Sequence, residues 1–291
     1  MVERRHYRLT LRGAEAVLGE RTWVMGVLNV TPDSFSDGGR FKEPGAAVDH
    51  GLALFEEGAD VVDVGGESTR PGGAAAVGDA EECRRVVPVI RALRDRGAGP
   101  LSVDTTKASV ARAALDAGAD IVNDVSGFRF DPAMAPLVAE RRVPAVLMHL
   151  RGDFTDMHRE PRYEDVVGEI RDELRDRLEE SKKAGIDASQ IIVDPGLGFA
   201  KSAGHSLEVL RRLPELAELD RPLLVGPSRK RFIGRALRSP DGADLPVAER
   251  LMGTAAAVAA CVLAGAHVVR VHDVREMVQV ARVCDAILAG E

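Results

Sequence analysis

Residues 24–39 read VMGVLNVTPDSFSDGG. The run before Asn29 is apolar apart from one glycine, and it predicts a buried strand. The threonine, proline, aspartate, serine and glycine that follow predict a polar loop. Parallel α/β proteins carry functional groups on loops at the carboxyl ends of strands, so this stretch predicts a strand that leads into a functional loop.

A short phrase recurs along the chain. GADVVDVGG at 58–66, GADIVNDVSG at 118–127 and GAHVVRVHDV at 265–274 each place Gly-Ala before a Val-rich run. Glycine commonly ends helices because it adopts the left-handed conformation without steric penalty, so we interpret the phrase as a repeated helix-to-strand unit. Further strands are expected at 100–106, 143–149, 191–197 and 222–226, and helices at 46–59, 80–96, 107–117, 132–142, 163–184, 206–219, 247–264 and 274–288.

About eight strand–helix units predict a closed (β/α)8 (TIM) barrel, which typically needs roughly 250 residues. We therefore treat residues 1–291 as a single α/β barrel domain. Residues 6–11 alternate polar and apolar, and Gly13 can turn the chain, so residues 1–21 are expected to form an N-terminal hairpin that closes the barrel bottom. A doubly wound open sheet is the alternative, but the first strand is not followed by GxGxxG.

The composition restricts the possible partners and the compartment. A net charge of −7 argues against a broad nucleic-acid surface, which would need a basic face. The three cysteines are widely spaced and contain no CxxC, which predicts reduced thiols. The charged N-terminal stretch does not resemble a signal peptide, and no uninterrupted apolar run is long enough to span a membrane. We therefore expect a cytoplasmic protein.

Polar and charged side chains follow almost every expected strand. A barrel binds its substrate at the carboxyl ends of its strands, so these side chains are expected to meet at one face. Any one of them could instead cap a helix or bond within a loop, but the joint pattern is harder to explain in that way. The residues are Asn29, Glu67, Ser68, Thr69, Arg70, Asp104, Asn123, Asp124, Met148, His149, Asp194, Ser228, Arg229, Lys230, Arg270 and His272.

These side chains divide into two chemical groups. Carboxylate, amide and ammonium groups suit the edges of a flat, nitrogen-rich heterocycle. That first group consists of Asp104, Asn123, Asp194 and Lys230. The second group suits phosphate oxygens, together with a hard metal ion that Asn29 would help to bind. It consists of Asn29, Thr69, Arg70, Arg270 and His272.

Several of the strand-end residues also have structural interpretations. Asp124 points to the opposite side of its strand from Asn123, so we assign it a structural role. His149 is expected either to touch ligand or to orient neighbouring loops. Arg229 is expected either to meet substrate or to tie down its loop, and Glu67 to shape the second loop.

LNVTPDSFSDGG at 28–39 and DVGGESTRPG at 63–72 resemble the two signature stretches of the dihydropteroate synthase family, a group of pterin-binding TIM-barrel enzymes of folate biosynthesis. The rest of that family's pattern follows in order, and the resemblance runs from about Trp23 to the end of the final helix. The matching stretches are SVDTTK at 102–107, IVNDVSG at 121–127, VLMHLRG at 146–152, DPGLGFAK at 194–201, GPSRKRFIG at 226–234 and VRVHDV at 269–274.

The resemblance implies a transferase that condenses (7,8-dihydropterin-6-yl)methyl diphosphate with 4-aminobenzoate, giving 7,8-dihydropteroate and diphosphate, with Mg2+ as cofactor. It implies catalytic roles for Asp37, Asp104 and Lys230, and a metal contact for Asn29. The implied pterin contacts are Asp104, Asn123, Met148, Asp194, Phe199, Gly226 and Lys230. The implied diphosphate contacts are Asn29, Thr69, Arg70, Arg270 and His272, and the implied 4-aminobenzoate contacts are Phe35, Thr69, Pro71, Lys230 and Arg231.

The implied chemistry follows an SN1-like course. Breaking the C–O bond first leaves positive charge on the dihydropterin methylene, which a carboxylate such as Asp104 would stabilise. A helix that opens at Ser228 or Arg229 would bind the 4-aminobenzoate carboxylate through its N-terminus. Many family members have serine where this chain has Arg231, so here that hydroxyl contact is lost. The Ala-rich stretch 255–264 leads us to expect a homodimer.

Two other functions remain as alternatives. The pterin-binding domain of methyltetrahydrofolate-dependent methyltransferases shares the barrel and the Asp, Asn and Asp ring contacts, but it does not need the NVTPDSF loop, SRK or the final Arg-x-His. A non-catalytic paralogue that binds pterin or an anion would be expected to lack one of the site residues. All of the following are present: Asn29, Asp37, Thr69, Lys230, Arg270 and His272.

Overall fold

The structure, a computed structural model, describes residues 4–11, 13–31, 44–67, 77–153 and 162–290. Its main sheet has eight parallel strands in the order β8-β7-β6-β5-β4-β3-β10-β9. A parallel bridge between Val193 and Leu223 brings the two ends of the sheet together, so the predicted barrel is confirmed as nearly closed. The strands are β3 (Trp23–Asn29), β4 (Val61–Gly65), β5 (Leu101–Asp104), β6 (Ile121–Asp124), β7 (Ala145–Met148), β8 (Ile191–Asp194), β9 (Leu224–Val225) and β10 (Val268–Val271).

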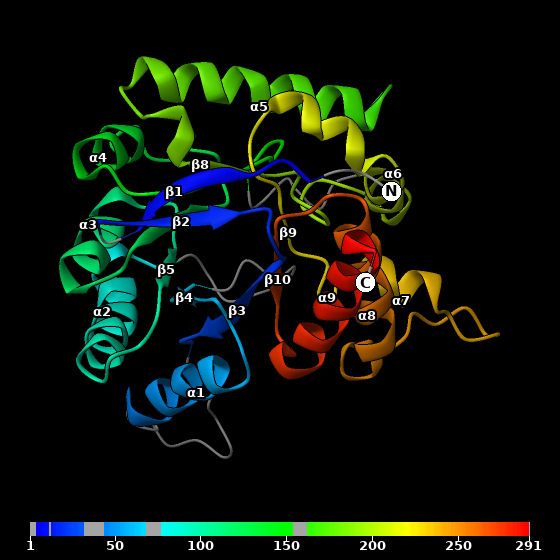
Figure 1. The fold of residues 1–291 in the computed structure, drawn as a ribbon, viewed down its shortest axis with the longest axis horizontal. Helices are drawn as coiled ribbons and strands as arrows, with labels where there is room; N and C mark the ends of the chain where they lie inside the picture. The colour runs from blue at the N-terminus through cyan, green and yellow to red at the C-terminus, as the bar shows by residue number, and fades with distance from the viewer. Residues whose placement is uncertain (1–3, 12, 32–43, 68–76, 154–161, 291) are drawn as a thin grey trace.

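Helices lie around the strands and connect them in turn (Figure 1). The recurring Gly-Ala phrase ends helices as predicted, because Gly58, Gly118 and Gly265 have φ angles of 103°, 113° and 99°. The helices are α1 (Pro44–Glu56), α2 (Asp79–Asp95), α3 (Ala108–Ala117), α4 (Met134–Arg141), α5 (Val166–Lys183), α6 (Ala203–Arg211), α7 (Arg231–Ala236), α8 (Leu251–Leu263) and α9 (Val274–Ala289).

An antiparallel hairpin of β1 (Tyr7–Leu11) and β2 (Ala14–Leu18) precedes the barrel, as predicted (Figure 1). Its buried residues Leu9, Leu11 and Leu18 join a cluster with apolar side chains at the amino-terminal ends of the barrel strands. Each fully buried aliphatic side chain contributes roughly 1.5–3 kcal/mol. The hairpin therefore closes the barrel bottom, opposite to the strand ends where the functional residues were expected. The barrel partners in this cluster are Met25, Val61, Ile121, Val146, Ile192, Leu224 and Val268.

Three predicted helices were wrong in their extent. The helix expected at 206–219 is α6 followed by the 3-10 helix Leu213–Leu219, since Pro214 lacks the N–H that would continue an α-helix. The helix expected at 247–264 begins as a 3-10 turn, Val247–Glu249, before α8. The helix expected to open at Ser228 or Arg229 begins only at Arg231, because Arg229 has a left-handed φ of 56°.

The sequence also makes predictions about the cysteine thiols and about the length and polarity of the helices. Cys83, Cys261 and Cys284 carry free thiols, and the last two are buried. In the parts of the chain that the structure describes, every helix is too short or too polar to cross a bilayer.

Candidate active site

A charged network lies at the carboxyl ends of the barrel strands. Arg270, on β10, donates from Nε to Asp63 Oδ2 at 2.6 Å and from Nη2 to Asp104 Oδ2 at 2.7 Å. Asn123, at the end of β6, donates from Nδ2 to the same Asp63 oxygen at 2.9 Å. The structure therefore brings together Asp104, Asn123 and Arg270, which were predicted from their strand-end positions.

Asp63 is a candidate site residue that the sequence analysis missed. It lies in β4, two residues before the strand ends, and is completely buried. A buried carboxylate requires charged or hydrogen-bonding partners, and here Arg270 and Asn123 provide them. Its Oδ1 has no hydrogen-bond partner among the described residues. The available signal was one acidic residue inside the apolar run VVDVG.

Burial sets the protonation of Asp104. Loss of hydration raises its pKa to about 7; the Arg270 guanidinium opposes the rise, and the negative charge of Asp63 adds to it. Two carboxylates thus share one guanidinium. Near neutral pH Asp104 can therefore exist with or without its proton.

Arg270 also joins the two chemical groups that the sequence analysis had separated. It was assigned to the phosphate-binding group, yet its guanidinium contacts Asp104, a member of the ring-binding group. The two groups are therefore adjacent and share a charge. An anion that binds Arg270 would compete with the carboxylates for its N–H groups.

Asp194 and Lys230 lie beside this network, at the opening formed by the carboxyl ends of the strands, which we call the mouth of the barrel. Asp194 ends β8 and accepts a hydrogen bond from Gly196 N at 2.7 Å through Oδ1. Burial raises its pKa, and Lys230 opposes that rise. Burial likewise lowers the pKa of Lys230 to about 8, while Asp194 acts in the opposite direction. Lys230 Nζ donates to the Leu197 carbonyl.

An apolar patch lies beside these charged groups. Met148, at the end of β7, clusters with Val125, Leu150 and Ala200, and Phe199 packs against the cluster. The Phe199 ring centroid lies 4.6 Å from Lys230 Nζ, which is a cation–π distance. Polar edges next to an apolar surface suit a flat heterocycle that is hydrogen-bonded at its rim.

The remaining described residues of the predicted phosphate group lie nearby. His272 follows β10; its backbone N donates to Ser228 Oγ at 3.2 Å, and its Nδ1 lies 2.9 Å from the same oxygen. Asn29 ends β3, two strands from β5 and next to β10 in the sheet. Gly226 follows β9 beside Arg270, because a Cβ added to it would lie 3.7 Å from the Arg270 Cβ. Phe35, Asp37, Thr69, Arg70 and Pro71 lie outside the described residues.

Several strand-end residues have structural partners. Asp124 accepts hydrogen bonds from Ser126 N and Phe128 N, so its predicted structural role is confirmed. Arg229 pairs with Asp273, which ties down its loop. Arg231 points outward: its side chain is 79% exposed and its Nε lies 3.7 Å from Asp244 Oδ2.

Glu67 connects the two ends of the second loop. Its Oε1 accepts from Val77 N at 3.1 Å, and its Oε2 pairs with Lys107 Nζ at 2.5 Å. Lys107 also pairs with the buried Glu82 at 2.5 Å. These contacts link Glu67, which precedes residues 68–76, to residues that follow them, and a role for Glu67 in shaping the second loop stays a prediction.

Comparison with known proteins shows the family to which the chain belongs. The sequence pattern of the family described as "Pterin binding enzyme" matches residues 25–272. The chain belongs to this family. Among its pterin-binding relatives, a dihydropteroate synthase of Mycobacterium leprae is 52% identical over 266 residues, covering 91% of this chain and 93% of the relative. One from Synechocystis is 47% identical over 269 residues, covering 92% of this chain and 91% of the relative.

Solved structures of dihydropteroate synthases have the same fold as this chain. A Xanthomonas albilineans dihydropteroate synthase with 4-aminobenzoic acid has a TM-score of 0.89 at 46% identity, covering 98% of this chain and 99% of that one. A structure of the same enzyme in complex with 7,8-dihydropteroate has a TM-score of 0.86 at 44% identity, covering 97% of this chain and 99% of that one. The family resemblance read from the motifs is therefore confirmed.

Proposed function

We propose that the protein condenses (7,8-dihydropterin-6-yl)methyl diphosphate with 4-aminobenzoate to give 7,8-dihydropteroate and diphosphate. It is a transferase of folate biosynthesis, as its relatives are dihydropteroate synthases over most of their length. The observation that carries the proposal is the set of carboxylate, amide and ammonium groups around the apolar patch of Met148 and Phe199.

The pterin ring lies on the apolar patch with its polar edge toward β5, β6 and β8. The Asp194 carboxylate accepts from the 2-amino group and N3–H, because one carboxylate can accept two parallel N–H bonds. Asn123 and Asp104 face the N1 and N8 side. Lys230 donates near O4 and N5, and its ammonium lies 4.6 Å from the centroid of the Phe199 ring.

Asp104, Lys230 and Asp37 are the catalytic groups in this proposal. The C–O bond to diphosphate breaks with its electron pair on the leaving oxygen, and the methylene cation is delocalised into the ring. The ionised Asp104 carboxylate stabilises that charge as it develops in the buried mouth. The arylamine nitrogen of 4-aminobenzoate then forms the new C–N bond and releases one proton, so no nucleophilic side chain is required.

The leaving diphosphate is placed at Arg270, His272 and Asn29, and Thr69 and Arg70 complete this group. Within the part of the chain that the structure describes, no cluster of three or more His, Cys, Asp or Glu side chains could hold a metal ion. Mg2+ takes oxygen ligands, usually one or two carboxylates plus substrate phosphates. Asn29 would offer a neutral amide oxygen in place of a carboxylate, so the diphosphate oxygens would supply the negative charge. When bound, Mg2+ would neutralise the leaving group.

The 4-aminobenzoate is placed between Lys230 and the first two loops, with Phe35, Thr69 and Pro71 as contacts and Asp37 closing over it. Arg231 is the least favoured of the proposed contacts. Its guanidinium lies toward Asp244 in the exposed loop, so reaching the carboxylate would require breaking that pair.

A homodimer through α8 and α9 is part of the proposal, and the cytoplasm remains the predicted location. Met252, Ala256 and Ala260 are exposed at four-residue spacing on α8, so they form one stripe, and Met252 is 77% exposed. Val283 and Ile287 form a similar exposed pair on α9. Light scattering after size exclusion should give a dimer, and Met252→Asp should give a monomer. Leu207→Asp, an exposed leucine on α6, is the matched control.

The activity test follows dihydropteroate and diphosphate together. Purified protein with the dihydropterin diphosphate and Mg2+ is assayed with and without 4-aminobenzoate. Formation of dihydropteroate in step with diphosphate release supports the synthase. Saturable pterin binding without any product would instead favour the non-catalytic or methyl-transfer alternatives.

A further inference from the structure

A buried lysine outside the proposed reaction carries the further inference. Lys201 is only 8% exposed, although it ends a surface loop. Its Nζ lies 2.9 Å from His149 Nδ1 and 3.0 Å from the Phe199 carbonyl oxygen. A buried ammonium is costly unless it is hydrogen-bonded, so these partners explain how the chain tolerates it.

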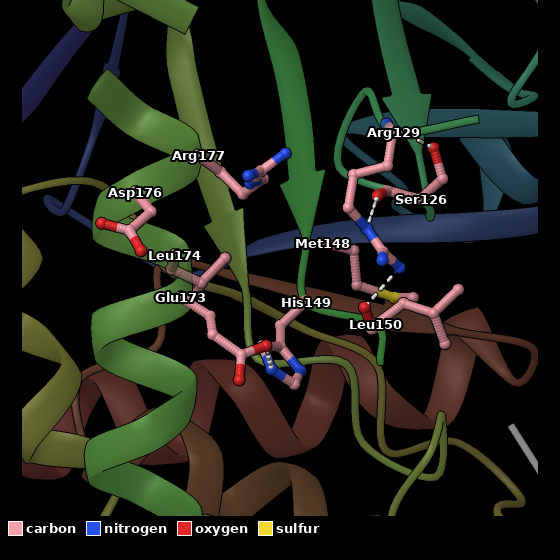
Figure 2. A pocket seen from close by; sticks show the side chains of 9 residues that line it. All are labelled: Ser126, Arg129, Met148, His149, Leu150, Glu173, Leu174, Asp176 and Arg177. Carbon is pink, nitrogen blue, oxygen red and sulfur yellow. Dashed lines mark hydrogen bonds and ion pairs between the residues drawn. The ribbon is translucent and has the colours of Figure 1, made fainter. Parts of the chain in front are cut away.

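His149 connects Lys201 to α5 through a second hydrogen bond. Its Nε2 lies 3.0 Å from Glu173 Oε2, and Figure 2 shows the two side chains facing each other beside Met148. Burial lowers the pKa of His149 to about 4, so the ring is neutral and has one N–H. Glu173 is ionised, because His149 and Arg151 outweigh desolvation and lower its pKa to about 2, and a carboxylate can only accept. His149 Nε2 therefore carries the proton toward Glu173, and Nδ1 accepts from Lys201. The chain of donors runs from Lys201 through His149 to Glu173.

Lys201 bonds a loop that has one strained residue, Ala200. Gly196, Gly198 and Ala200 have φ angles of 67°, 75° and 45°, all in the left-handed region, and alanine is disfavoured there. Two loop carbonyls accept side-chain hydrogen bonds: Lys201 bonds the Phe199 oxygen from within the loop, and Tyr163 Oη donates to the Ala200 oxygen at 3.1 Å. The loop has one backbone hydrogen bond of its own, from Phe199 N to the Gly196 carbonyl at 3.1 Å, and side chains supply the other contacts that fix it near Ala200.

This loop carries groups of the pterin site. It begins at Asp194, whose carboxylate accepts from Gly196 N, and it includes Phe199, whose ring lies under the Lys230 ammonium. Lys230 itself donates to the Leu197 carbonyl in the same loop. A shift of the loop would therefore move ring contacts and leave Arg270, on β10, and His272, just after it, in place.

The His149–Glu173 end of this series of hydrogen bonds borders a cavity of about 170 Å³ between α5 and the loops after β6 and β7. His149 and Glu173 line it, together with Arg129 and Arg177 (Figure 2). Arg129 donates to the carbonyls of Ser126 and Leu150, so the cavity wall is already hydrogen-bonded. The cavity leaves room for substitutions at position 149.

We propose that Lys201 is a positioning residue for pterin binding, which acts through His149 and the Phe199 carbonyl to hold the 194–201 loop in its binding conformation. The inference rests on the proposed function, since it needs a pterin at this mouth. It does not involve the diphosphate contacts.

The test compares two ligands on Lys201→Met, a substitution of similar length without charge. Binding of 6-hydroxymethyl-7,8-dihydropterin and of inorganic diphosphate is measured by calorimetry. We expect the pterin Kd to rise at least tenfold and the diphosphate Kd to change less than twofold. Lys183→Met, an exposed lysine at the end of α5, is the control and should leave both constants unchanged.

Two outcomes overturn the inference. Equal weakening of both ligands would mean that Lys201 is merely structural, and unchanged pterin binding would mean that the loop needs no such support. If the unsubstituted protein binds diphosphate but no pterin, the proposed function itself fails, which is a separate and recognisable result.

A pair of substitutions at His149 keeps the test decisive if Lys201→Met does not fold. Asparagine can place an amide oxygen near the position of Nδ1 and accept from Lys201, whereas glutamine reaches the position of Nε2. His149→Asn should bind the pterin within threefold of the unsubstituted protein, and His149→Gln should bind it at least tenfold more weakly. The reverse order, or no difference, contradicts the proposed route through Nδ1.

Discussion

Asp63→Ala removes the carboxylate that bonds both Arg270 and Asn123. Breaking a buried ion pair by removing one partner typically costs about 3–5 kcal/mol, and Arg270 retains Asp104, so we expect about 3 kcal/mol from that loss. Loss of the acceptor for Asn123 adds about 1 kcal/mol. The free energy of unfolding, measured with urea, should therefore fall by about 3–4 kcal/mol.

Two variants sharpen this measurement. Asp63→Asn keeps the shape and one acceptor oxygen, so it should lose clearly less stability than alanine. Ser102→Ala is the matched control: Ser102 is the register partner of Asp63 on β5, and it is equally buried. Its hydroxyl has no hydrogen-bond partner among the described residues, so its loss should be nearly neutral. A loss below about 1 kcal/mol for Asp63→Ala, or an equal loss for Ser102→Ala, would refute the reasoning.

The remaining predictions concern binding and catalysis. Asp194→Ala should abolish binding of 6-hydroxymethyl-7,8-dihydropterin, and retained tight binding would overturn the ring assignment. Arg270→Ala should weaken inorganic diphosphate at least tenfold and the pterin less, because its loss also removes the partner of Asp104, whereas equal loss of both would count against separate contacts. Burial holds the pKa of Asp104 at about 7 and lowers that of Lys230 to about 8, and catalysis needs the carboxylate ionised and the ammonium protonated, so kcat/KM should rise about sixfold from pH 6 to pH 7.5 and fall again above pH 8. A flat profile would exclude that role. Arg231→Ser should change the KM for 4-aminobenzoate less than threefold, because the side chain is exposed and turned toward Asp244; a larger change in steady-state assays would place Arg231 in the site.

The fold could be predicted because the barrel repeats itself. The phrase at 58–66, 118–127 and 265–274 encodes the same local event, a glycine that ends a helix and a valine-rich strand that follows. Such local signals are strong when they recur. Helix ends were less predictable, since Pro214 and the left-handed Arg229 changed them through a single residue each.

The candidate site was predictable where a polar residue ends a strand, as at Asp104, Asn123 and Asp194. Asp63 was missed because it lies inside a strand, where polarity alone does not say which way a side chain points. Lys201 was missed for a different reason: its burial depends on β7 and α5, which are distant in sequence. The pairing of Arg270 with both carboxylates likewise arises only when β4, β5 and β10 close into one ring.

The hairpin at the barrel bottom separates two tasks along one axis. Its leucines fasten the amino-terminal strand ends together, while the opposite ends present charged groups that are costly to bury. Substitutions at the mouth and in its loops can therefore accumulate without destabilising the apolar cluster at the barrel bottom. Such a division lets ligand specificity change while the fold stays stable. Sequence variation is therefore expected at the mouth, and stabilising substitutions are best placed in the apolar cluster under the hairpin.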